Sequence, residues 1–183
     1  MKTILNKEDI LNFWFLECTP AQWFKKNPDF DSNLATRFLS TVENGLSRKL
    51  ESWADSKSGY LSLILVLDQF TRNIFRNTPR AFSGDTMALS LSFQCHEREF
   101  LLNQNIHWSH FMLLPMMHSE DISIQESSLP LFRKFTTQKA YEFALRHRDI
   151  VARFGRFPHR NSILGRTSTD KELKFLLQPR SSF

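Results

Sequence analysis

One stretch near the middle of the chain decides the fold: Leu61-Ser62-Leu63-Ile64-Leu65-Val66-Leu67-Asp68-Gln69-Phe70-Thr71-Arg72-Asn73-Ile74-Phe75-Arg76. Its first half is apolar nearly all round, a pattern typical of a helix that is buried on every side. At 3.6 residues per turn, Asp68, Arg72 and Arg76 fall on one stripe of this helix. Gln69 and Asn73 flank the stripe. Because unpaired charges are costly to bury, these groups must meet a ligand or each other, and a purely structural Asp68–Arg72 ion pair is about equally open.

Helix signals continue on both sides of this stretch, and no convincing strand pattern accompanies them. Asn6, Thr19-Pro20 and Asn27-Pro28 each open a helix. Further helices are expected at about residues 56–75, 84–102, 108–117, 120–135 and 138–154, and after the capping box that starts at residue 169. Gly155 is expected to end one of them. The sequence therefore predicts an all-α fold, and the chain of 183 residues carries no linker that would divide it into domains.

Composition fits a folded protein of a reducing compartment. The 18 Phe against 5 Gly favour large side chains packed between helices. Cys18 and Cys95 are far apart in the sequence and form no CxxC pair, so neither a disulfide framework nor a cysteine-based zinc site is indicated. The N-terminus meets charge too early for a signal peptide, and the best apolar run, residues 60–67, is far shorter than the roughly 20 residues of a membrane span. A cytoplasmic location without a membrane partner is expected.

The net charge of +5 is concentrated in a C-terminal window, residues 146–166. The window holds one acid, Asp149, no lysine, and the arginines at positions 146, 148, 153, 156, 160 and 166. Arginine without lysine favours bidentate pairing with carboxylate or phosphate groups. A nucleic-acid-binding protein more often spreads both residue types along one face, so nucleic acid is an unlikely partner.

A second polar run, Met117-His118-Ser119-Glu120-Asp121, follows an apolar segment. Ser119 is expected to cap a helix, with Glu120 and Asp121 in the first turn, where the helix dipole favours acids. Capping does not explain His118. With Asp121 it would form a general base and its orienting acid, or two metal ligands. The spacing matches no recognised metal motif, so no metal site is predicted.

The third run spans residues 146–161. His147 falls on the apolar face of the expected helix, and the His-Arg-Asp triplet lacks the other motifs of a protein kinase. The tight connection after Gly155 carries Arg156, His159 and Arg160, and such a loop can close an anionic pocket. A structural corner, in which the arginines bond to carbonyls at helix ends, is the alternative.

Together these segments resemble a known family. The blocks that carry the resemblance are Asn12-Phe13-Trp14-Phe15, Trp23-Phe24, Leu67-Asp68-Gln69-Phe70-x-Arg72-Asn73-Ile74, Thr78-Pro79-Arg80-Ala81-Phe82, Met117-His118-Ser119-Glu120-Asp121-x-x-x-Gln125 and His147-Arg148-Asp149-Ile150-x-x-Arg153-Phe154-Gly155-Arg156-Phe157-Pro158-His159-Arg160-Asn161. They resemble a widespread bacterial family of unknown function, classed with tetratricopeptide-like helical proteins, over essentially the whole chain. The resemblance implies an irregular stack of antiparallel helices, an α-α superhelix, and no activity. Pro130 departs from the family pattern and should kink or end its helix.

The leading hypothesis is a polar pocket that binds an anionic small molecule or an acidic peptide end. The expected ligand-binding residues are Arg72, Arg76, Arg153, Arg156 and Arg160 with Asn73 and His159, and the expected orienting residues are Asp68, Gln69, His118, Asp121 and His147. One alternative is an enzyme in which His118 or His147 acts as general base, tuned by Asp121 or Asp149 and with or without a metal. Another is a scaffold that grips a peptide. The sequence indicates no particular cofactor or oligomeric state.

Overall fold

The apolar stretch forms a helix through the centre of the molecule. A computed structural model describes residues 5–179, 181 and 182. In it, α4 (Lys57–Ile64) continues into the π-helical turn η3 (Leu65–Phe70) and then into α5 (Thr71–Ile74). Every residue from 59 to 71 is buried, as the absence of a polar face predicts.

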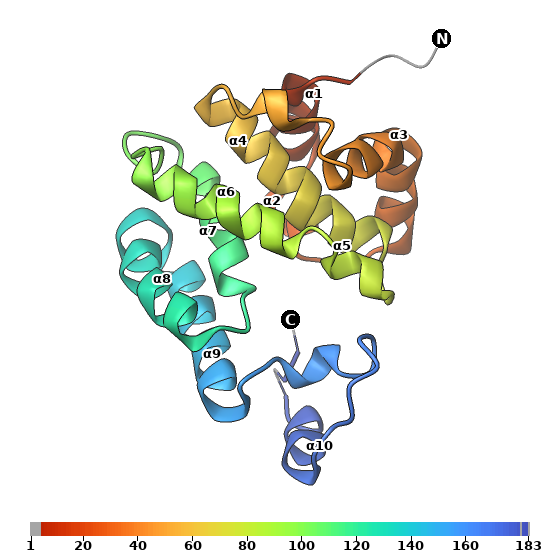
Figure 1. The fold of residues 1–183 in the computed structure, drawn as a ribbon, viewed down its shortest axis with the longest axis vertical. Helices are drawn as coiled ribbons and strands as arrows, with labels where there is room; N and C mark the ends of the chain where they lie inside the picture. Colours follow the sequence, from red (N-terminus) through yellow and green to blue (C-terminus); the bar gives the residue numbers. More distant parts are fainter. Residues whose placement is uncertain (1–4, 180, 183) are drawn as a thin grey trace.

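The N-terminal helices cover one side of this central helix (Figure 1). They are α1 (Lys7–Asn12) with its π-helical continuation η1 (Phe13–Glu17), α2 (Pro20–Trp23) and α3 (Pro28–Leu46). Asn6 and Asn27 cap α1 and α3 with their side chains, as predicted. The apolar face of α3 is buried at Leu34, Phe38 and Val42. Rings of Phe13, Trp14, Phe38 and Phe70, tilted against one another, fill the space between these helices and η3.

The C-terminal half is a succession of helices that pack on their neighbours in the sequence. They are α6 (Asp85–Glu97), α7 (Ile106–Met117), α8 (Ile122–Phe135) and α9 (Gln138–Phe154). The short helices η2 (Glu51–Trp53), η4 (Pro79–Phe82) and η5 (Pro158–Arg160) lie in connections, and α10 (Asp170–Leu176) follows η5 at the lower end of the view in Figure 1. No strand occurs among the described residues, and the all-helical class is confirmed. The tetratricopeptide-like arrangement and the single domain stay predictions.

Three local predictions can be compared with the structure. Gly155 ends α9 in the left-handed conformation, with φ of 68°, as predicted. Pro130 does not end α8, which continues to Phe135, so a helix end at this proline is wrong, and a kink there stays a prediction. The helix expected to reach residue 102 stops at Glu97, and Glu99 then adopts a positive φ of 57°, which a helix cannot accommodate.

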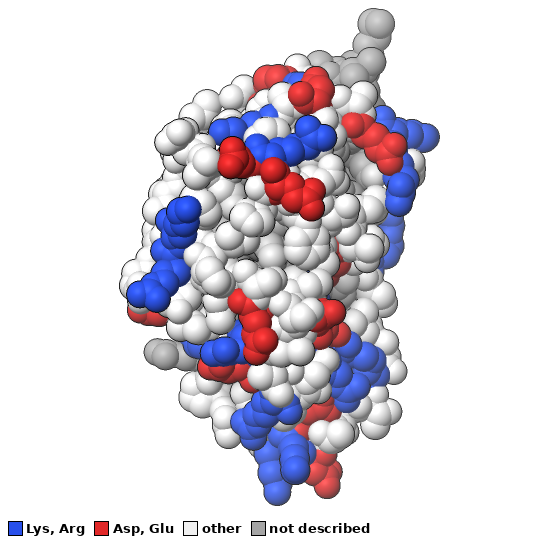
Figure 2. Space-filling model, turned by 60° about the vertical axis from the view of Figure 1, so that its left-hand side comes forward, with Lys and Arg blue, Asp and Glu red and all other residues white. Residues whose placement is uncertain are grey.

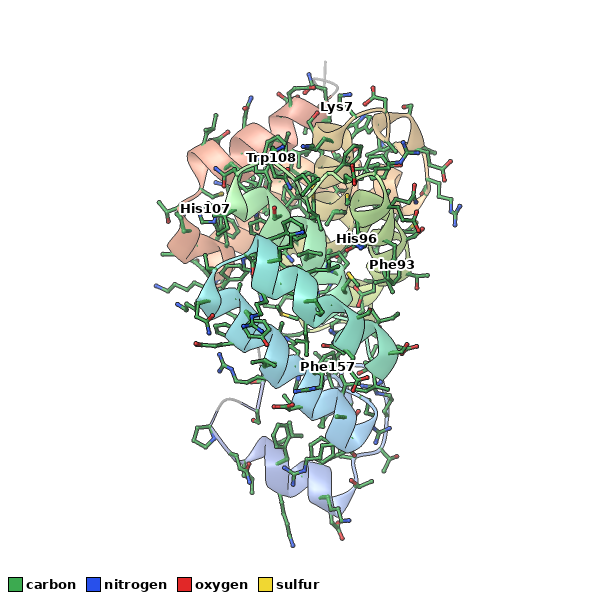
Figure 3. The ribbon with its side chains drawn as sticks, turned by 90° about the vertical axis from the view of Figure 1, so that its left-hand side faces the viewer. Lys7, Phe93, His96, His107, Trp108 and Phe157 are labelled. Carbon is green, nitrogen blue, oxygen red and sulfur yellow. The ribbon has the colours of Figure 1, made fainter. Side chains whose placement is uncertain are left out.

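Two hydrophobic clusters hold the helices together. The larger lies around the central helix, and the smaller consists of Ile150, Val151 and Phe157, with Phe154 and Phe175 against it. Figure 3 labels Phe157, which lies where α9 gives way to the segment leading to α10. Among residues 5–179, 181 and 182, no helix has the length and apolarity needed to cross a bilayer.

Candidate functional site

A buried cluster consists of Asp68, Arg72, Asp85, His118 and Arg160, which are linked by successive contacts. Asp68 lies in the π-helical turn of the central helix. Such turns are frequent at functional sites because the extra residue redirects side chains. The segment before α6 approaches this turn so closely that a Cβ on Gly84 would lie 2.1 Å from the backbone oxygen of Leu67. Only glycine permits this approach. As a consequence, Asp85 at the start of α6 reaches Arg72 of the central helix.

Asp68 is fully buried and accepts bonds from three sides. Nδ1 of His118 lies 2.7 Å from its Oδ1, and Gln69 donates to its Oδ2 at 2.5 Å. Nη1 of Arg72 lies 3.0 Å from Oδ1. Burial alone would raise the pKa of Asp68, but the charge of Arg72 and the bond with His118 outweigh it and hold this pKa well below its usual range. Asp68 is therefore a carboxylate at neutral pH.

His118 lies at the C-terminal end of α7. Burial lowers the pKa of His118 more than the attraction of Asp68 raises it, so the imidazole is neutral at neutral pH. Because the carboxylate of Asp68 can only accept, the ring proton belongs on Nδ1. Among the described residues, none donates a hydrogen bond to Nε2 of His118. The side chain is 16% exposed, so this face of the cluster reaches solvent.

Arg72 and Arg160 share one acid but are satisfied to different degrees. Arg72 donates to both carboxylate oxygens of Asp85, at 2.7 and 3.1 Å. Nη1 of Arg160 lies 3.5 Å from Oδ2 of Asp85, and its buried Nε has no hydrogen-bond partner among the described residues. The Arg160 guanidinium lies 4.8 Å from the ring centre of Phe82 and 4.7 Å from that of Phe157. Burial, together with the charge of Arg72, lowers the pKa of Arg160 to about 10.

Two more histidines lie next to these groups, around Phe157. The ring of His147, on α9, is 6.4 Å from that of His118 and 5.5 Å from that of Phe157. Its Nδ1 lies 2.8 Å from the backbone oxygen of Phe143. Burial lowers the pKa of His147 to about 3, and burial with the charge of Arg160 lowers that of His159 to about 4. The structure thus brings His147 and His159 beside the cluster, in neutral form.

Two of the predicted binding residues, Asn73 and Arg76, bond to each other, and Arg76 also bonds to α3 instead of joining Asp68 and Arg72. Arg76 donates to both oxygens of Asp31 on α3, at 2.6 and 2.8 Å, and to Oδ1 of Asn73 at 2.7 Å. Asn73 in turn donates to the backbone oxygen of Gln69. These contacts tie α3 to the central helix and leave Arg76 outside the buried cluster.

Asp121 is not the acid that orients His118. Its carboxylate caps α8 by accepting from the backbone of Ser123 at 2.8 Å, so the predicted His118–Asp121 pair is wrong, as is the prediction that Ser119 is the cap. A bond to two nearby backbone N–H groups is simpler to form than one that turns back to the preceding helix. Asp149 pairs with the adjacent Arg148 at the surface.

The arginines of the C-terminal window lie in separate places. Arg156 makes two bonds to Glu172 of α10, at 2.7 and 2.8 Å. Arg166 makes two bonds to Glu120, at 2.5 and 2.9 Å. Arg153 is exposed and lies over the ring of Phe154, 4.7 Å from its centre. A single pocket lined by all the predicted arginines is therefore a wrong expectation.

The sequence also gave no reason to single out Asp85 or Glu120. Asp85 follows Gly84, and that glycine is the only local hint of a close approach. The sequence predicts Glu120 in the first turn of a helix, whereas its carboxylate accepts from Arg166 and from the backbone N–H of Phe157 at 2.7 Å. The excess of arginine over acids in the C-terminal window is the sequence feature that indicates acidic partners elsewhere in the chain.

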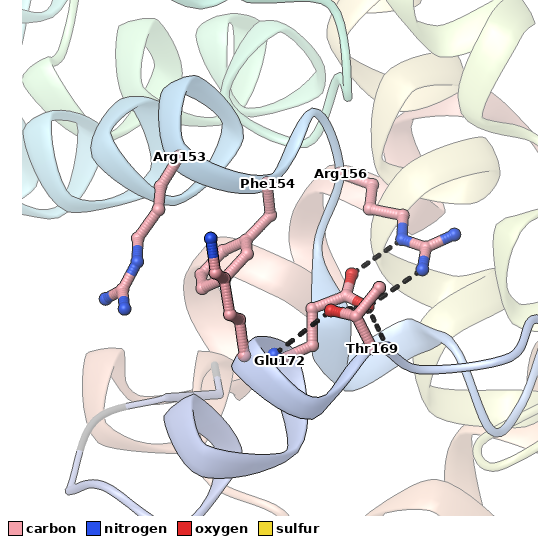
Figure 4. A pocket seen from close by; sticks show the side chains of 6 residues that line it. Arg153, Phe154, Arg156, Thr169 and Glu172 are labelled. Atoms are coloured by element: carbon pink, nitrogen blue, oxygen red, sulfur yellow. Dashed lines mark hydrogen bonds and ion pairs between the residues drawn. The ribbon is translucent and has the colours of Figure 1, made fainter.

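Two hollows on the surface of the described residues lie away from the buried cluster. One, of about 570 Å³, lies between α9 and α10 and is lined in part by Arg153, Arg156 and Glu172 (Figure 4). The other, of about 340 Å³, is mainly apolar and lies between α1, η1, α2 and the start of α7, where Figure 3 labels His107 and Trp108. In the view of Figure 2, Lys and Arg side chains gather at the lower end of the molecule. Within the described part of the chain, no group of three or more His, Cys, Asp or Glu is placed to hold a metal ion.

Comparisons with known proteins give a family and a fold. The sequence model of a family described as "Bacterial protein of unknown function (DUF924)" matches residues 10–180. The solved structure of the protein of unknown function ATU0120 from Agrobacterium tumefaciens is similar, with a TM-score of 0.88 and 35% sequence identity. The match covers 93% of this chain and 96% of that one. No curated protein matches the sequence.

Proposed function

The chain belongs to the DUF924 family of bacterial proteins of unknown function, and we propose that it binds a small anionic group, such as a carboxylate, at Arg160 and Arg72, beside His118. The observation that carries this proposal is the guanidinium of Arg160. Only 8% of its side chain is exposed, and within the part of the chain that the structure describes its Nε has no hydrogen-bond partner. An arginine has five N–H donors, and leaving a buried donor unsatisfied costs about 1–3 kcal/mol.

The surroundings of Arg160 favour an external anion over an internal partner. Both oxygens of Asp85 already accept from Arg72 at 3.1 Å or less, so Arg160 is left with a 3.5 Å contact to that acid. Phe82 and Phe157 flank the guanidinium and offer it no acceptor. A ligand oxygen would supply the missing acceptor, and the planar fork of arginine matches the geometry of a carboxylate or phosphate.

Access and charge limit the size of this ligand. The side chains of Arg72 and His118 are 18% and 16% exposed, so a single small group can reach the cluster from solvent. The charges of Asp68 and Asp85 offset those of the two arginines. An anion therefore gains hydrogen bonds from donors held in place, more than attraction to a net positive charge.

Calorimetric titration with acetate and with inorganic phosphate tests this proposal. We expect Arg160→Gln to weaken binding at least about tenfold, since a hydrogen bond to a charged group contributes about 1.5–3 kcal/mol. Arg80→Gln is the matched control, because Arg80 forms an exposed pair with Glu43 and its loss removes the same charge. Binding that is lost in Arg153→Gln and kept in Arg160→Gln would assign the anion to the hollow of Figure 4 and refute the proposal.

A second candidate function is general-base catalysis by His118. The 2.7 Å contact between Asp68 and Nδ1 of His118 favours it, because a buried acid that holds the other ring nitrogen is the usual support of a histidine base. The neutral imidazole presents Nε2 for proton abstraction. A screen of carboxylate and phosphate esters with wild-type protein and His118→Ala tests this function. Equal rates for the two proteins would exclude a catalytic role for His118.

A further inference from the structure

The hydrogen-bond donors and acceptors that the buried cluster presents limit the class of ligand that can bind to it. Its outward groups other than His118 act as donors, because Arg72 and Arg160 carry only N–H groups. Asp68 and Asp85 have acceptor oxygens, but those of Asp68 are occupied by His118, Gln69 and Arg72. Those of Asp85 accept from Arg72. Nε2 of His118 is different, since it is an acceptor to which no described residue donates.

The acceptor and the unsatisfied donor lie at two ends of one chain of contacts. His118 contacts Asp68 at 2.7 Å, and Asp68 contacts Arg72 at 3.0 Å. Arg72 contacts Asp85 at 2.7 Å, and Arg160 contacts the same acid at 3.5 Å. The ring of His118 lies 6.4 Å from that of His147, which lies 5.5 Å from that of Phe157, and the guanidinium of Arg160 lies 4.7 Å from the centre of the same Phe157 ring. A ligand of a few atoms held by Arg160 and Arg72 therefore lies close to His118.

A ligand that carries only an anionic group fits this arrangement poorly. Its oxygens have lone pairs alone, and the lone pair of Nε2 would repel them. A ligand with an O–H group on the neighbouring carbon donates to Nε2, while its anionic oxygens accept from the arginines. A carboxylate suits the cluster better than a phosphate dianion, since the two arginines are already offset by two acids.

We infer that the ligand is a small 2-hydroxy carboxylate, an inference that rests on the function proposed above. Its carboxylate accepts from Arg160 and Arg72, and its hydroxyl donates to Nε2 of His118. Asp68 determines this preference without touching the ligand, because its bond to Nδ1 of His118 fixes the imidazole tautomer in which Nε2 is an acceptor. Asp68 and Gln69 thus act as positioning residues in this site.

Paired titrations with glycolate and acetate test the inference. Both are two-carbon monoanions near neutral pH, and glycolate differs by its hydroxyl group. We expect wild-type protein to bind glycolate about five- to tenfold more tightly than acetate, the usual contribution of one hydrogen bond. In folded His118→Phe, acetate should still bind and the preference for glycolate should disappear.

A second measurement does not depend on the folding of the variant. Nitrogen chemical shifts of wild-type His118 should show a proton on Nδ1, and glycolate should shift the Nε2 resonance more than acetate does. Equal binding of glycolate and acetate, or a preference that persists without His118, would overturn the inference and leave anion binding intact. Binding of neither anion would overturn the proposed function as well.

Discussion

The buried cluster and the corner between α9 and α10 use the same residue types in opposite ways. At the corner, two arginines each have their own acid: Arg156 makes two bonds to Glu172, and Arg166 makes two to Glu120. In the cluster, Arg72 and Arg160 share Asp85, and Arg160 keeps a buried donor for which the described residues offer no acceptor. The corner is a closed network that fastens the C-terminal segment. The cluster is an open network that holds donors ready, which is what a binding site requires.

The largest effect that separates the two networks is expected for Arg72→Met. This change leaves the buried carboxylate of Asp68 without its cation and Asp85 without its two bonds. Removing one partner of a buried pair typically costs about 3–5 kcal/mol, and we expect the free energy of unfolding to fall by that amount. Urea denaturation measures it.

The matched control for Arg72→Met is Arg80→Met, since Arg80 forms an exposed pair with Glu43. Its effect should stay within about 0.5 kcal/mol. Similar losses in the two variants would mean that the buried cluster adds no more to stability than a surface ion pair.

A smaller loss is expected at the corner, for Glu120→Gln. The substitution keeps the shape and an acceptor for the N–H of Phe157, but it removes the charge that Arg166 engages. Both side chains are about one quarter exposed, so solvent reduces the effect to about 1–2 kcal/mol. Thermal unfolding at two salt concentrations measures it, and added salt should narrow the difference from wild type. A loss equal to that of Arg72→Met would erase the distinction between the two networks.

As the pH falls below neutral, the free energy of unfolding should first lose the contribution of the buried neutral histidines, among them His147 beside the cluster. The pKa of His147 is lowered by burial to about 3, against about 6.5 in an unfolded chain. The unfolded state therefore binds one more proton between these values, and this part of the stability is full above pH 6.5 and is lost as the pH falls toward 3. His110 and His159, with pKa values of about 4, act in the same direction. The lowered pKa values of Glu120 and Glu172 make their contributions fall only below about pH 4.5.

His147→Phe tests this assignment. It removes one of the protons taken up on unfolding, so the slope of stability against pH between 5 and 6 should decrease by about 1.4 kcal/mol per pH unit at most. Urea denaturation across that range measures the slope. An unchanged slope would show that His147 titrates normally and is not buried in its neutral form.

Local signals in the sequence predict the helices, whereas contacts between distant segments determine which polar groups pair in the buried cluster. The caps at Asn6 and Asn27 and the stop at Gly155 depend on neighbouring residues, so their chemistry is visible in the sequence. The stripe on the central helix and the apolar position of His118 also indicate that polar groups are buried together. The partners could not be predicted, because they lie far apart along the chain. His118 bonds to an acid 50 positions away, and the acid three residues after it serves as a cap.

The smallest expected effect has the opposite sign and concerns Arg160→Met. Methionine has a similar length, fits between Phe82 and Phe157, and removes the unsatisfied Nε donor. Asp85 keeps both bonds to Arg72, so no carboxylate is left without a partner. We expect the ligand-free variant to be about 1 kcal/mol more stable than wild type, as is common when a group kept for binding is removed. Urea denaturation without added anions measures this gain, and a loss of 2 kcal/mol or more would place Arg160 among the structural arginines of the corner.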